Sequence, residues 1–395
     1  MNDPSWKFET SAIRIQIPTT REGEHSTPLY LTSSFIFEDA EEMGEVFAGN
    51  RDGNIYARFT NPNVDEFATK MAALEGTEAA FATGSGMSAV YVSFMTFLVA
   101  GDHMLSTREI FGSTASILNN FLPKSGITYD YIDLTKPEMW DLVLKPNTKL
   151  LYLETPSNPG LAIFDIKRIS SFCKSYGILL VVDNCFATPY LQRPADFGAD
   201  LVVHSATKYI DGQGRVLGGV ICGNRDHVEK VKNFCRSVGP SLSPFNAWIL
   251  SKSLETLAVR MDRHCDNAHK IATYLADHRQ IKNLRYPYLP SHPQHELAIT
   301  QMRQGGGMVS FEIEGGLSAG RAFLDGLTLF SRTANLGDTR SIVSHPASTT
   351  HARMTVEDKL AVGITDEFIR LSIGLEHVDD LIADLDQAFF RLKNK

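Results

Sequence analysis

Short apolar runs alternate with longer amphipathic stretches over the middle of the chain. Apolar runs of roughly four to eight residues bounded by polar residues are typical of buried strands, whereas a longer helical period indicates a helix. Six runs are predicted as strands: His103–Ser106, Thr128–Ile132, Leu150–Leu153, Ile178–Val182, Leu201–Val203 and Val220–Cys222. Helices are predicted between them at Ser113–Leu122 and Ile166–Tyr176. This alternation predicts an α/β fold with a mainly parallel sheet covered by helices on both faces.

The two ends of the chain differ from this middle part. The first 60 residues are polar and weakly periodic, with one strand-like stretch at Leu29–Phe37, and they are predicted to form an extended arm. Composition changes near Ser237–Ser243, and a long helical stretch from Pro244 to His278 follows. A second α/β pattern then comes from Met308–Ile313, Leu317–Leu324, Phe368–Ile373 and a helix from Val378. We therefore expect three parts: an arm over 1–60, a ligand-binding domain over 61–255 and a smaller domain over 256–395.

Composition narrows the class of protein. Of the 395 residues, 43% are hydrophobic and 21% are charged, which is ordinary for a globular enzyme with a large core. The net charge of −8 argues against a nucleic-acid partner, because phosphate binding needs a basic surface. The apolar segment Ala89–Ala100 is too short to span a bilayer and is predicted as a buried helix. Since the polar first ten residues also lack the apolar core of a signal peptide, we expect a cytoplasmic protein with no membrane association.

Cysteine and histidine spacing argues against two kinds of structural site. The five cysteines are odd in number and contain no C-x-x-C pair: Cys173, Cys185, Cys222, Cys235 and Cys265. This pattern predicts buried reduced thiols rather than a disulfide framework or a zinc cluster. The histidines show no H-E-x-x-H spacing, so no metal is expected.

Candidate chemistry is most concentrated in the stretch Leu201–Gly219. Its apolar run ends near the hydroxyls of Ser205 and Thr207, Lys208 follows directly, and a loop with four glycines comes next. Hydroxyls can donate to an anion, and a lysine amine kept from full protonation can attack a carbonyl. The stretch therefore predicts a site for an anionic carbonyl compound, with a surface lysine on a glycine-rich loop as the alternative.

A second glycine-rich turn, Gly84–Ala89, follows a short predicted strand and opens a helix. The unpaired N–H groups at the start of such a helix can bind an anion. Neither this turn nor Gly212–Gly218 has the G-x-G-x-x-G spacing of dinucleotide-binding folds. A nicotinamide-dependent dehydrogenase is therefore disfavoured.

Charged residues at or within buried strands need partners. Asp183 ends a buried run, where it can pair with a protonated pyridine nitrogen, cap a helix or bind a metal. Arg370 interrupts an apolar strand, where it can bind a substrate carboxylate or an internal Asp or Glu. In an extended segment, Tyr56 and Arg58 would face one side and could clamp a phosphate, although a surface salt bridge explains them as well. A lysine, a carboxylate and an anion cradle are together what pyridoxal phosphate requires.

Ordered motifs along the chain resemble those of the cystathionine γ-synthase-like (Cys/Met metabolism) branch of fold-type-I pyridoxal phosphate enzymes. The match runs from about Ser11 to the C-terminus and rests on these motifs: Tyr56-x-Arg58, Asn61-Pro62, Gly84–Ala89, Ser157–Pro159, Val182–Asn184, Ser205–Tyr209, His345–Ala347 and Arg370–Gly374. The resemblance implies pyridoxal 5'-phosphate as cofactor. It also implies an aspartate aminotransferase-like fold, with a mainly parallel seven-stranded sheet in the cofactor-binding domain and a smaller C-terminal α/β domain.

The family pattern implies a role for each matching residue. Lys208 would hold the cofactor covalently and later move protons, and Asp183 would pair with its ring nitrogen. Arg370 would bind the substrate carboxylate, with Asn158 and Asn335 close to the substrate. The phosphate would be bound by Gly86, Met87, Ser205, Thr207 and, from the neighbouring subunit, Tyr56 and Arg58. Because the site is shared, the resemblance implies an obligate dimer, commonly paired into a homotetramer.

One position departs from the family pattern. Phe111 stands where the family usually has a tyrosine. A phenylalanine can stack on the cofactor ring but cannot transfer a proton. Lys208, Tyr56 or water would therefore have to share the acid–base catalysis.

Subfamily features indicate a transferase of the homoserine-ester sulfhydrylase kind. Methionine γ-lyases commonly have a cysteine where this chain has Ser113, and cystathionine synthases and lyases commonly have an acidic residue where it has Ala334. Without that acid the amine of a cysteine acceptor lacks an obvious partner, which fits a small inorganic nucleophile. We expect γ-replacement on O-succinylhomoserine or O-acetylhomoserine with sulfide, giving homocysteine for methionine biosynthesis, and the chain looks most like the O-succinylhomoserine kind. The alternatives are a cystathionine γ-synthase, a cystathionine or methionine γ-lyase and, more distantly, a non-catalytic pyridoxal phosphate-binding protein.

Overall fold

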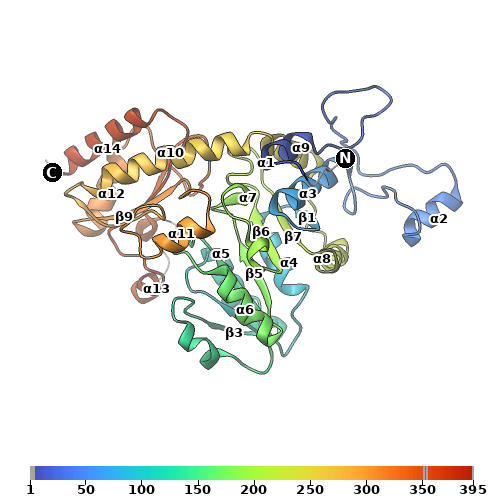
Figure 1. The fold of residues 1–395 in the computed structure, drawn as a ribbon, viewed down its shortest axis with the longest axis horizontal. Coiled ribbons are helices and arrows are strands. Elements are labelled where there is room, and N and C mark those ends of the chain that lie inside the picture. Colours follow the sequence, from blue (N-terminus) through green and yellow to red (C-terminus); the bar gives the residue numbers. More distant parts are fainter. Residues whose placement is uncertain (1–4, 350–351, 353–354, 394–395) are drawn as a thin grey trace.

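A seven-stranded sheet forms the centre of the protein in a computed structural model that describes residues 5–349, 352 and 355–393 (Figure 1). The strand order is β1-β7-β6-β5-β4-β2-β3. Strand β7 runs antiparallel to its neighbours β1 and β6, and the other neighbouring pairs are parallel. The strands are β1 (Ala79–Thr83), β2 (His103–Ser106), β3 (Thr128–Tyr131), β4 (Thr148–Glu154), β5 (Leu179–Asp183), β6 (Leu201–Ser205) and β7 (Gly219–Gly223). The predicted mainly parallel sheet of seven strands is confirmed.

Helices cover both faces of this sheet, as predicted. On one face lie α4 (Gly86–Met95), α5 (Gly112–Asn120) and α8 (Arg225–Val238). On the other lie α3 (Pro62–Glu75), α6 (Ile166–Tyr176), α7 (Thr188–Leu191) and α9 (Pro244–Leu254). Side chains alternate between the faces along each strand, so Tyr152 packs in the first core and Leu153 in the second.

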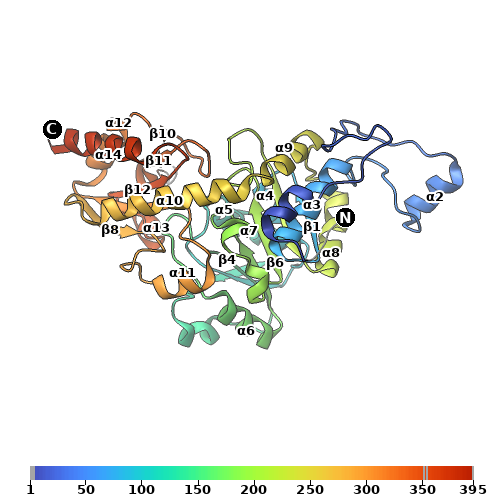
Figure 2. The same cartoon turned by 45° about the horizontal axis from the view of Figure 1, so that its top comes forward.

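A five-stranded sheet with order β10-β11-β12-β9-β8 organises the C-terminal part. Its strands are β8 (Ile281–Arg285), β9 (Met308–Ile313), β10 (Ser331–Arg332), β11 (Ile342–Ser344) and β12 (Phe368–Ser372). The helices of this part are α10 (Leu257–Ala276), α11 (His295–Gln301), α12 (Gly316–Gly326), α13 (Val356–Ala361) and α14 (Val378–Lys393). Helix α10 leads from the first sheet to the second, where it packs beside α14 (Figure 2). This arrangement agrees with a smaller C-terminal α/β part, while the boundaries at 60/61 and 255/256 stay predictions.

The N-terminal segment differs from its prediction. It contains two short helices, α1 (Phe8–Arg14) and α2 (Ala40–Ala48), and α2 projects away from the body of the protein (Figures 1 and 2). The expected strand at Leu29–Phe37 is wrong, because only Ser34 pairs there, in an isolated bridge with Tyr56. Ile36 is 99% exposed, so the apolar residues of this stretch have no sheet to join within the described residues. Apolar pattern alone does not make a strand where no neighbouring strand is available.

Two helical predictions are also corrected. The stretch from Pro244 to His278 is two helices, α9 and α10, separated at Glu255 and Thr256. The helix expected at Ala89–Ala100 begins and ends earlier, as α4. Over the part of the chain that the structure describes, no helix combines the length and apolar character needed to cross a bilayer.

Candidate active site

A cavity of about 270 Å³ lies at the carboxyl ends of β4, β5 and β6. Most of the residues singled out from the sequence line it: Gly86, Met87, Phe111, Asn158, Asp183, Ser205, Thr207, Lys208 and Arg370. Ligands of open α/β sheets bind at this edge. The structure thus brings together residues that lie up to 284 positions apart (86 to 370) in the chain.

The register of the strands explains why the polar residues at their carboxyl ends lie close together. Glu154 lies opposite Asp183, and Asp183 lies opposite Val203, in the parallel pairs β4–β5 and β5–β6. Because side chains alternate along a strand, Glu154, Asp183 and Ser205 all end on the face covered by α4 and α5. Three polar side chains therefore meet on one face at the open edge of the sheet.

The start of α4 forms the anion cradle predicted from the glycine turn. Ser85 caps the helix by accepting a hydrogen bond of 3.1 Å from the N–H of Ser88. Gly86 packs directly on β6, where an added Cβ would come within 2.5 Å of the Ser205 Cβ, so only glycine fits. The first turn of a helix carries unpaired N–H groups and a partial positive charge. Together with the hydroxyls of Ser205 and Thr207, this turn is suited to a phosphate.

Lys208 follows β6 and is held against the second sheet. Its Nζ donates a hydrogen bond of 2.6 Å to Asn335 Oδ1. Burial lowers the pKa of Lys208, Cys185 acts in the opposite direction, and the charge of Arg370 again lowers it. An amine with a lowered pKa is a better nucleophile towards a carbonyl.

The loop that follows Lys208 is fixed by Arg260 of α10. This guanidinium donates to the carbonyl oxygens of Tyr209 at 2.6 Å and Ile210 at 3.3 Å. Arg260 is only 5% exposed, and His264, one turn further along α10, is fully buried. Arg260 and His264 therefore pack against the protein interior, whereas Asp262 and Arg263 between them are exposed.

Asp183 is held in place by two donors. Its Oδ1 accepts the N–H of Cys185 at 2.9 Å, and its Oδ2 lies 3.2 Å from the Tyr152 hydroxyl. Burial raises the pKa of Asp183, while the Cys185 N–H and the nearby His204 act in the opposite direction. Asp183 caps no helix, and within the described residues no group of three or more His, Cys, Asp or Glu side chains could hold a metal. Of the three interpretations of this carboxylate, pairing with a ring nitrogen is the one that fits its surroundings.

Arg370 lies on β12, 6% exposed, with its guanidinium at the cavity. Nη1 donates 2.9 Å to Asn158 Oδ1, and Nη2 lies 3.5 Å from the Asn335 carbonyl oxygen. Its Nε is buried without a partner, and no Asp or Glu of the described ranges forms an ion pair with it. Burial lowers the pKa of Arg370 to about 10. An internal carboxylate partner is thus not found, and a guanidinium with a free donor suits a carboxylate ligand.

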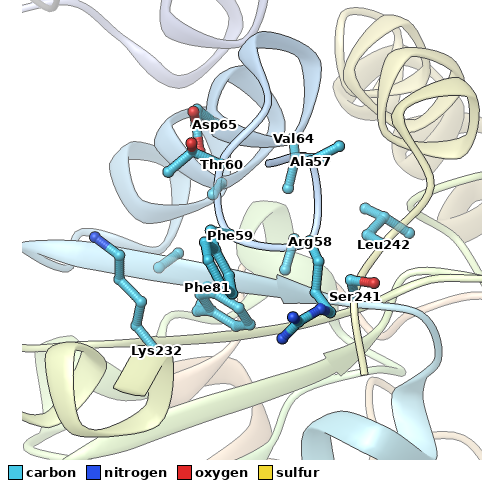
Figure 3. Close-up of a pocket in the computed structure, with 13 residues that line it drawn as sticks. Ala57, Arg58, Phe59, Thr60, Val64, Asp65, Phe81, Lys232, Ser241 and Leu242 are labelled. Atoms are coloured by element: carbon cyan, nitrogen blue, oxygen red, sulfur yellow. The ribbon is translucent and has the colours of Figure 1, made fainter. Parts of the chain in front are cut away.

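Tyr56 and Arg58 do not line the cavity of their own chain. Residues 57–59 form a turn rather than the expected extended segment, but the Arg58 guanidinium still lies 5.6 Å from the ring centroid of Tyr56. The Arg58 guanidinium lies 4.7 Å from the ring centroid of Phe59 and donates to the carbonyl oxygen of Arg236. Figure 3 shows this side chain between Phe59 and Phe81 on one side and Ser241 on the other. A role in a neighbouring subunit's site stays a prediction.

Several residues at the cavity were not selected from the sequence: Glu154, Thr114, Cys185 and Phe186 line it, and Tyr152 contacts Glu154 and Asp183. Glu154 is 6% exposed and lines the cavity, and its Oε1 accepts the N–H of Phe111 at 2.7 Å. Burial and the charge of Asp183 raise the pKa of Glu154 well above its usual range. The apolar run stops at Leu153, but β4 continues by one residue because Glu154 still pairs with Asp183. The register of adjacent strand ends could have revealed it.

The motif at His345–Ala347 supports the family resemblance, but its residues do not line the cavity. His345 is buried, and its ring contacts Ser348 Oγ at 2.7 Å and the Asp366 carbonyl oxygen at 2.8 Å, away from the residues that line the cavity. Thr350 and His351, at the end of this segment, lie outside the described residues. Ala334, earlier in the same segment, does line the cavity.

The class of site is defined by four features: a lysine with a lowered pKa, a buried carboxylate, a guanidinium without an ion-pair partner among the described residues, and a helix start suited to an anion. Such a site suits an anionic carbonyl cofactor and an amino-acid carboxylate. Comparison with known proteins gives the family. The family model described as "Cys/Met metabolism PLP-dependent enzyme" matches residues 9–390. The chain belongs to this family, and pyridoxal phosphate is its cofactor, as predicted.

Relatives and solved structures agree with this assignment. The chain is 47% identical to an O-succinylhomoserine sulfhydrylase of Pseudomonas aeruginosa, over 96% of this chain and 94% of the relative. It is 42% identical to an L-methionine gamma-lyase of Porphyromonas gingivalis, over 96% of both chains. A crystal structure from Campylobacter jejuni subsp. jejuni that carries N'-pyridoxyl-lysine-5'-monophosphate has a TM-score of 0.94 and 34% identity, covering 98% of this chain and 100% of that one. The fold-type-I class is confirmed.

Proposed function

We propose that the protein is a homoserine-ester sulfhydrylase that acts on O-succinylhomoserine, with O-acetylhomoserine as the second candidate ester. The Cγ–O bond of the ester breaks and a Cγ–S bond to hydrosulfide forms, so that the products are homocysteine and succinate. The 47% identity to an O-succinylhomoserine sulfhydrylase supports this assignment. Under this proposal the reaction belongs to the trans-sulfuration chemistry of methionine biosynthesis.

Each binding and proton-transfer step of the proposed reaction is assigned to a side chain of this protein. Arg370 and Asn158 bind the α-carboxylate, and Asp183 keeps the ring nitrogen protonated. Bound pyridoxal phosphate supplies the electron sink that acidifies the Cα and then the Cβ hydrogens of the substrate. Lys208 takes these protons in turn, succinate leaves from Cγ, hydrosulfide adds at Cγ, and the protons return to Cβ and Cα. The lowered pKa of Lys208 suits this work, because a base must be unprotonated to accept a proton.

The observation that carries the choice of sulfide is the chemistry of the cavity wall beside Lys208. Ala334, Leu336 and Leu217 line it there. The carboxylates that line the cavity are Glu154 and Asp183, and both are already engaged with Tyr152. An incoming cysteine would bring an ammonium group that needs a negative partner, whereas hydrosulfide needs none. The wall therefore favours a small inorganic nucleophile.

A methionine γ-lyase is the second candidate, because a relative with this name is 42% identical to the chain. That reaction would release 2-oxobutanoate, ammonia and a thiol instead of forming a new carbon–sulfur bond. Ser113 stands where γ-lyases commonly have a cysteine, which favours the sulfhydrylase.

Acceptor and ester competition tests the proposal. The protein is incubated with O-succinylhomoserine or O-acetylhomoserine and with either sulfide or cysteine, and homocysteine and cystathionine are quantified. Homocysteine from the succinyl ester should be the main product. Cystathionine as the main product would instead make the protein a cystathionine γ-synthase, and homocysteine only from the acetyl ester would change the substrate.

The site is proposed to be shared between subunits. Tyr56 and Arg58 are placed away from the cavity of their own chain, and their segment is preceded by the projecting helix α2 (Figure 1). We expect them to bind the phosphate in a neighbouring subunit, with Tyr56 taking part in proton transfer. This arrangement requires at least a dimer, and a homotetramer in the cytoplasm is the expected form.

A further inference from the structure

Two side chains connect Asp183 to Phe111, the residues proposed to contact the nitrogen and the face of the cofactor ring. The Tyr152 hydroxyl lies 3.2 Å from Asp183 Oδ2 and 3.2 Å from Glu154 Oε1. The same Glu154 oxygen accepts the Phe111 N–H at 2.7 Å. An unbroken line of polar contacts therefore runs from one ring contact to the other behind the cavity.

The fold fixes this line rigidly. Tyr152 and Glu154 are two residues apart on β4 and so point to the same face, and Glu154 is in register with Asp183 on β5. Tyr152 is fully buried, and the ring of Phe94 on α4 packs against it edge-on, with a centroid distance of 5.2 Å. The hydroxyl is thus held between the two carboxyl groups by a core that leaves it little freedom.

The hydrogens available between Tyr152 and the two carboxyl groups favour one neutral carboxyl over two ionised ones. Tyr152 carries one hydroxyl hydrogen, but its oxygen makes contacts of 3.2 Å with two carboxyl oxygens. If both carboxyls were ionised, one of these contacts would bring two lone pairs together without a hydrogen between them. A second hydrogen on one of the two carboxyl groups gives each contact a hydrogen of its own, which is more favourable than sharing one hydrogen between two negative groups.

The surroundings assign that hydrogen to Glu154. Asp183 receives the N–H of Cys185 and faces the cofactor's ring nitrogen, which both favour its ionised form. The titratable groups that act on Glu154 are Asp183 and Tyr152, and neither supplies positive charge. In the described part of the chain no Lys, Arg or His forms an ion pair with Glu154.

We propose that Tyr152 and Glu154 are positioning residues for the cofactor: Tyr152 donates to an ionised Asp183, and Glu154, as a neutral carboxylic acid, donates to Tyr152 and anchors the backbone of Phe111. The hydrogens then run in one direction, from Glu154 to Tyr152 to Asp183. This orientation keeps negative charge on Asp183, where a protonated ring nitrogen needs it. The proposal depends on the cofactor but not on the choice of ester or acceptor.

The test uses apo- and holoprotein of two variants, Tyr152→Phe and Glu154→Gln. Tyr152→Phe removes the hydroxyl and keeps the packed ring, so it should weaken pyridoxal phosphate binding roughly 3- to 10-fold, as expected for one net hydrogen bond. The melting temperature of its apoprotein should stay within about 3 °C of the wild type. Tyr129→Phe is the matched control, because its hydroxyl contacts Asn119 at the sheet edge, and its cofactor affinity should not change.

Glu154→Gln tests the neutral acid through the stability of the apoprotein. A carboxyl group with a raised pKa holds a proton in the folded state that it loses on unfolding, so wild-type stability falls as pH rises above about 4.5, the ordinary value for a glutamate. The glutamine variant lacks this proton, so its melting temperature should gain on the wild type steadily between about pH 5 and pH 8. Glu66→Gln, at a buried carboxylate whose pKa is lowered, should show no such gain.

Several results would overturn the proposal. One is an unchanged cofactor affinity in Tyr152→Phe, and another is a loss of affinity matched by a large loss of apoprotein stability, which would indicate a purely structural role. A third is a Glu154→Gln stability profile that runs parallel to the wild type across pH. Because cofactor binding and melting are measured without ester or sulfide, these results are independent of whether the sulfhydrylase assignment holds.

Discussion

Lys208 and Asn335 join the two sheets at the centre of the site: the lysine Nζ donates a hydrogen bond of 2.6 Å to the Asn335 Oδ1. Lys208 lies three residues after the end of β6, and Asn335 lies in the loop between β10 and β11. The contact is made to a neutral amide, so it orients the amine without the charge that would hold a proton on it. Burial lowers the pKa of Lys208, and the neutral Asn335 does not oppose this effect as a carboxylate at the same position would.

Replacing Asn335 by aspartate should reverse this effect. A carboxylate within hydrogen-bond distance favours the charged amine and should raise the pKa of Lys208, typically by about 1–3 units. The rising, acidic limb of the pH–rate profile should then shift to higher pH, and the rate at pH 7 should fall. Asn335→Ala removes the contact without adding charge and serves as the control. An acidic limb in Asn335→Asp that coincides with that of Asn335→Ala would contradict the account.

Arg370→Lys should separate substrate binding from cofactor binding. A lysine keeps the charge but lacks the planar fork that can bind a carboxylate through two hydrogen bonds. The KM for the homoserine ester should rise roughly tenfold or more, while the dissociation constant of pyridoxal phosphate stays the same. Arg332→Lys, an exposed arginine on β10 of the same sheet, should leave both constants unchanged. Equal losses of cofactor and substrate affinity would show that Arg370 acts on the fold of the site instead.

Mixing two inactive variants tests the shared site. Arg58→Ala and Lys208→Ala should each have strongly reduced activity as pure proteins. In a mixed dimer one site would carry both defects and the other neither, so random mixing should restore up to about a quarter of wild-type activity. Co-expression followed by an activity assay at known subunit ratio makes the measurement. No recovery in proven mixed dimers would place Arg58 in the site of its own chain.

We predict that a buried ion pair in α3, Glu66 with Lys70, stabilises the packing of the N-terminal segment on the body of the protein. Glu66 accepts hydrogen bonds from Ser251 Oγ at 2.6 Å, from the Ile17 N–H at 3.1 Å and from the Thr27 hydroxyl, and it lies 3.5 Å from Lys70 Nζ. Glu66→Ala would leave the buried Lys70 with Glu255, at 3.5 Å, as its remaining ion-pair partner and with the Ser251 carbonyl oxygen, at 3.4 Å, as a neutral acceptor. The free energy of unfolding should fall by about 3–5 kcal/mol, measured by urea unfolding at fixed protein concentration. The exposed Glu45→Ala should change it by less than about 0.5 kcal/mol.

The Glu66–Lys70 pair also predicts how the free energy of unfolding changes with pH. Burial alone would raise the pKa of Glu66, but the hydrogen bonds of Ser251 and Thr27 and the charge of Lys70 outweigh it, so the pKa is lowered. A lowered pKa gives stability that is present above the unfolded value of about 4.5 and is lost as pH falls through the folded value. The difference between wild type and Glu66→Ala should therefore shrink as the pH falls below about 4.5. A constant difference down to pH 3 would contradict this assignment.

Sequence pattern predicted the central sheet because its inner strands are buried on both faces and read as nearly uninterrupted apolar runs. The same criterion failed where a residue's surroundings come from distant segments. Ile36 lies in an apolar stretch but has no sheet beside it, and Arg260 looks solvated yet donates to carbonyls of the loop after Lys208. Tertiary contacts decided both cases.

The residues of the candidate site also differ in whether the sequence alone reveals them. Lys208, Asp183 and Arg370 stand out because a charged residue beside or within an apolar run is conspicuous in sequence. Tyr152 does not, because a tyrosine inside a strand reads as core, and Glu154 reads as the first residue of a loop. Their part in the site depends on strand register and on one hydroxyl between two carboxyls, which pattern and spacing do not encode.

Product partition from O-succinylhomoserine is the most direct test of the proposed reaction. Homocysteine, 2-oxobutanoate and succinate are measured together as the sulfide concentration is raised, with Lys208→Ala as the blank. The account predicts one homocysteine for each succinate at high sulfide, with 2-oxobutanoate falling in proportion. Release of one 2-oxobutanoate and one ammonia for each succinate, whatever the sulfide concentration, would contradict it and make the protein a γ-lyase.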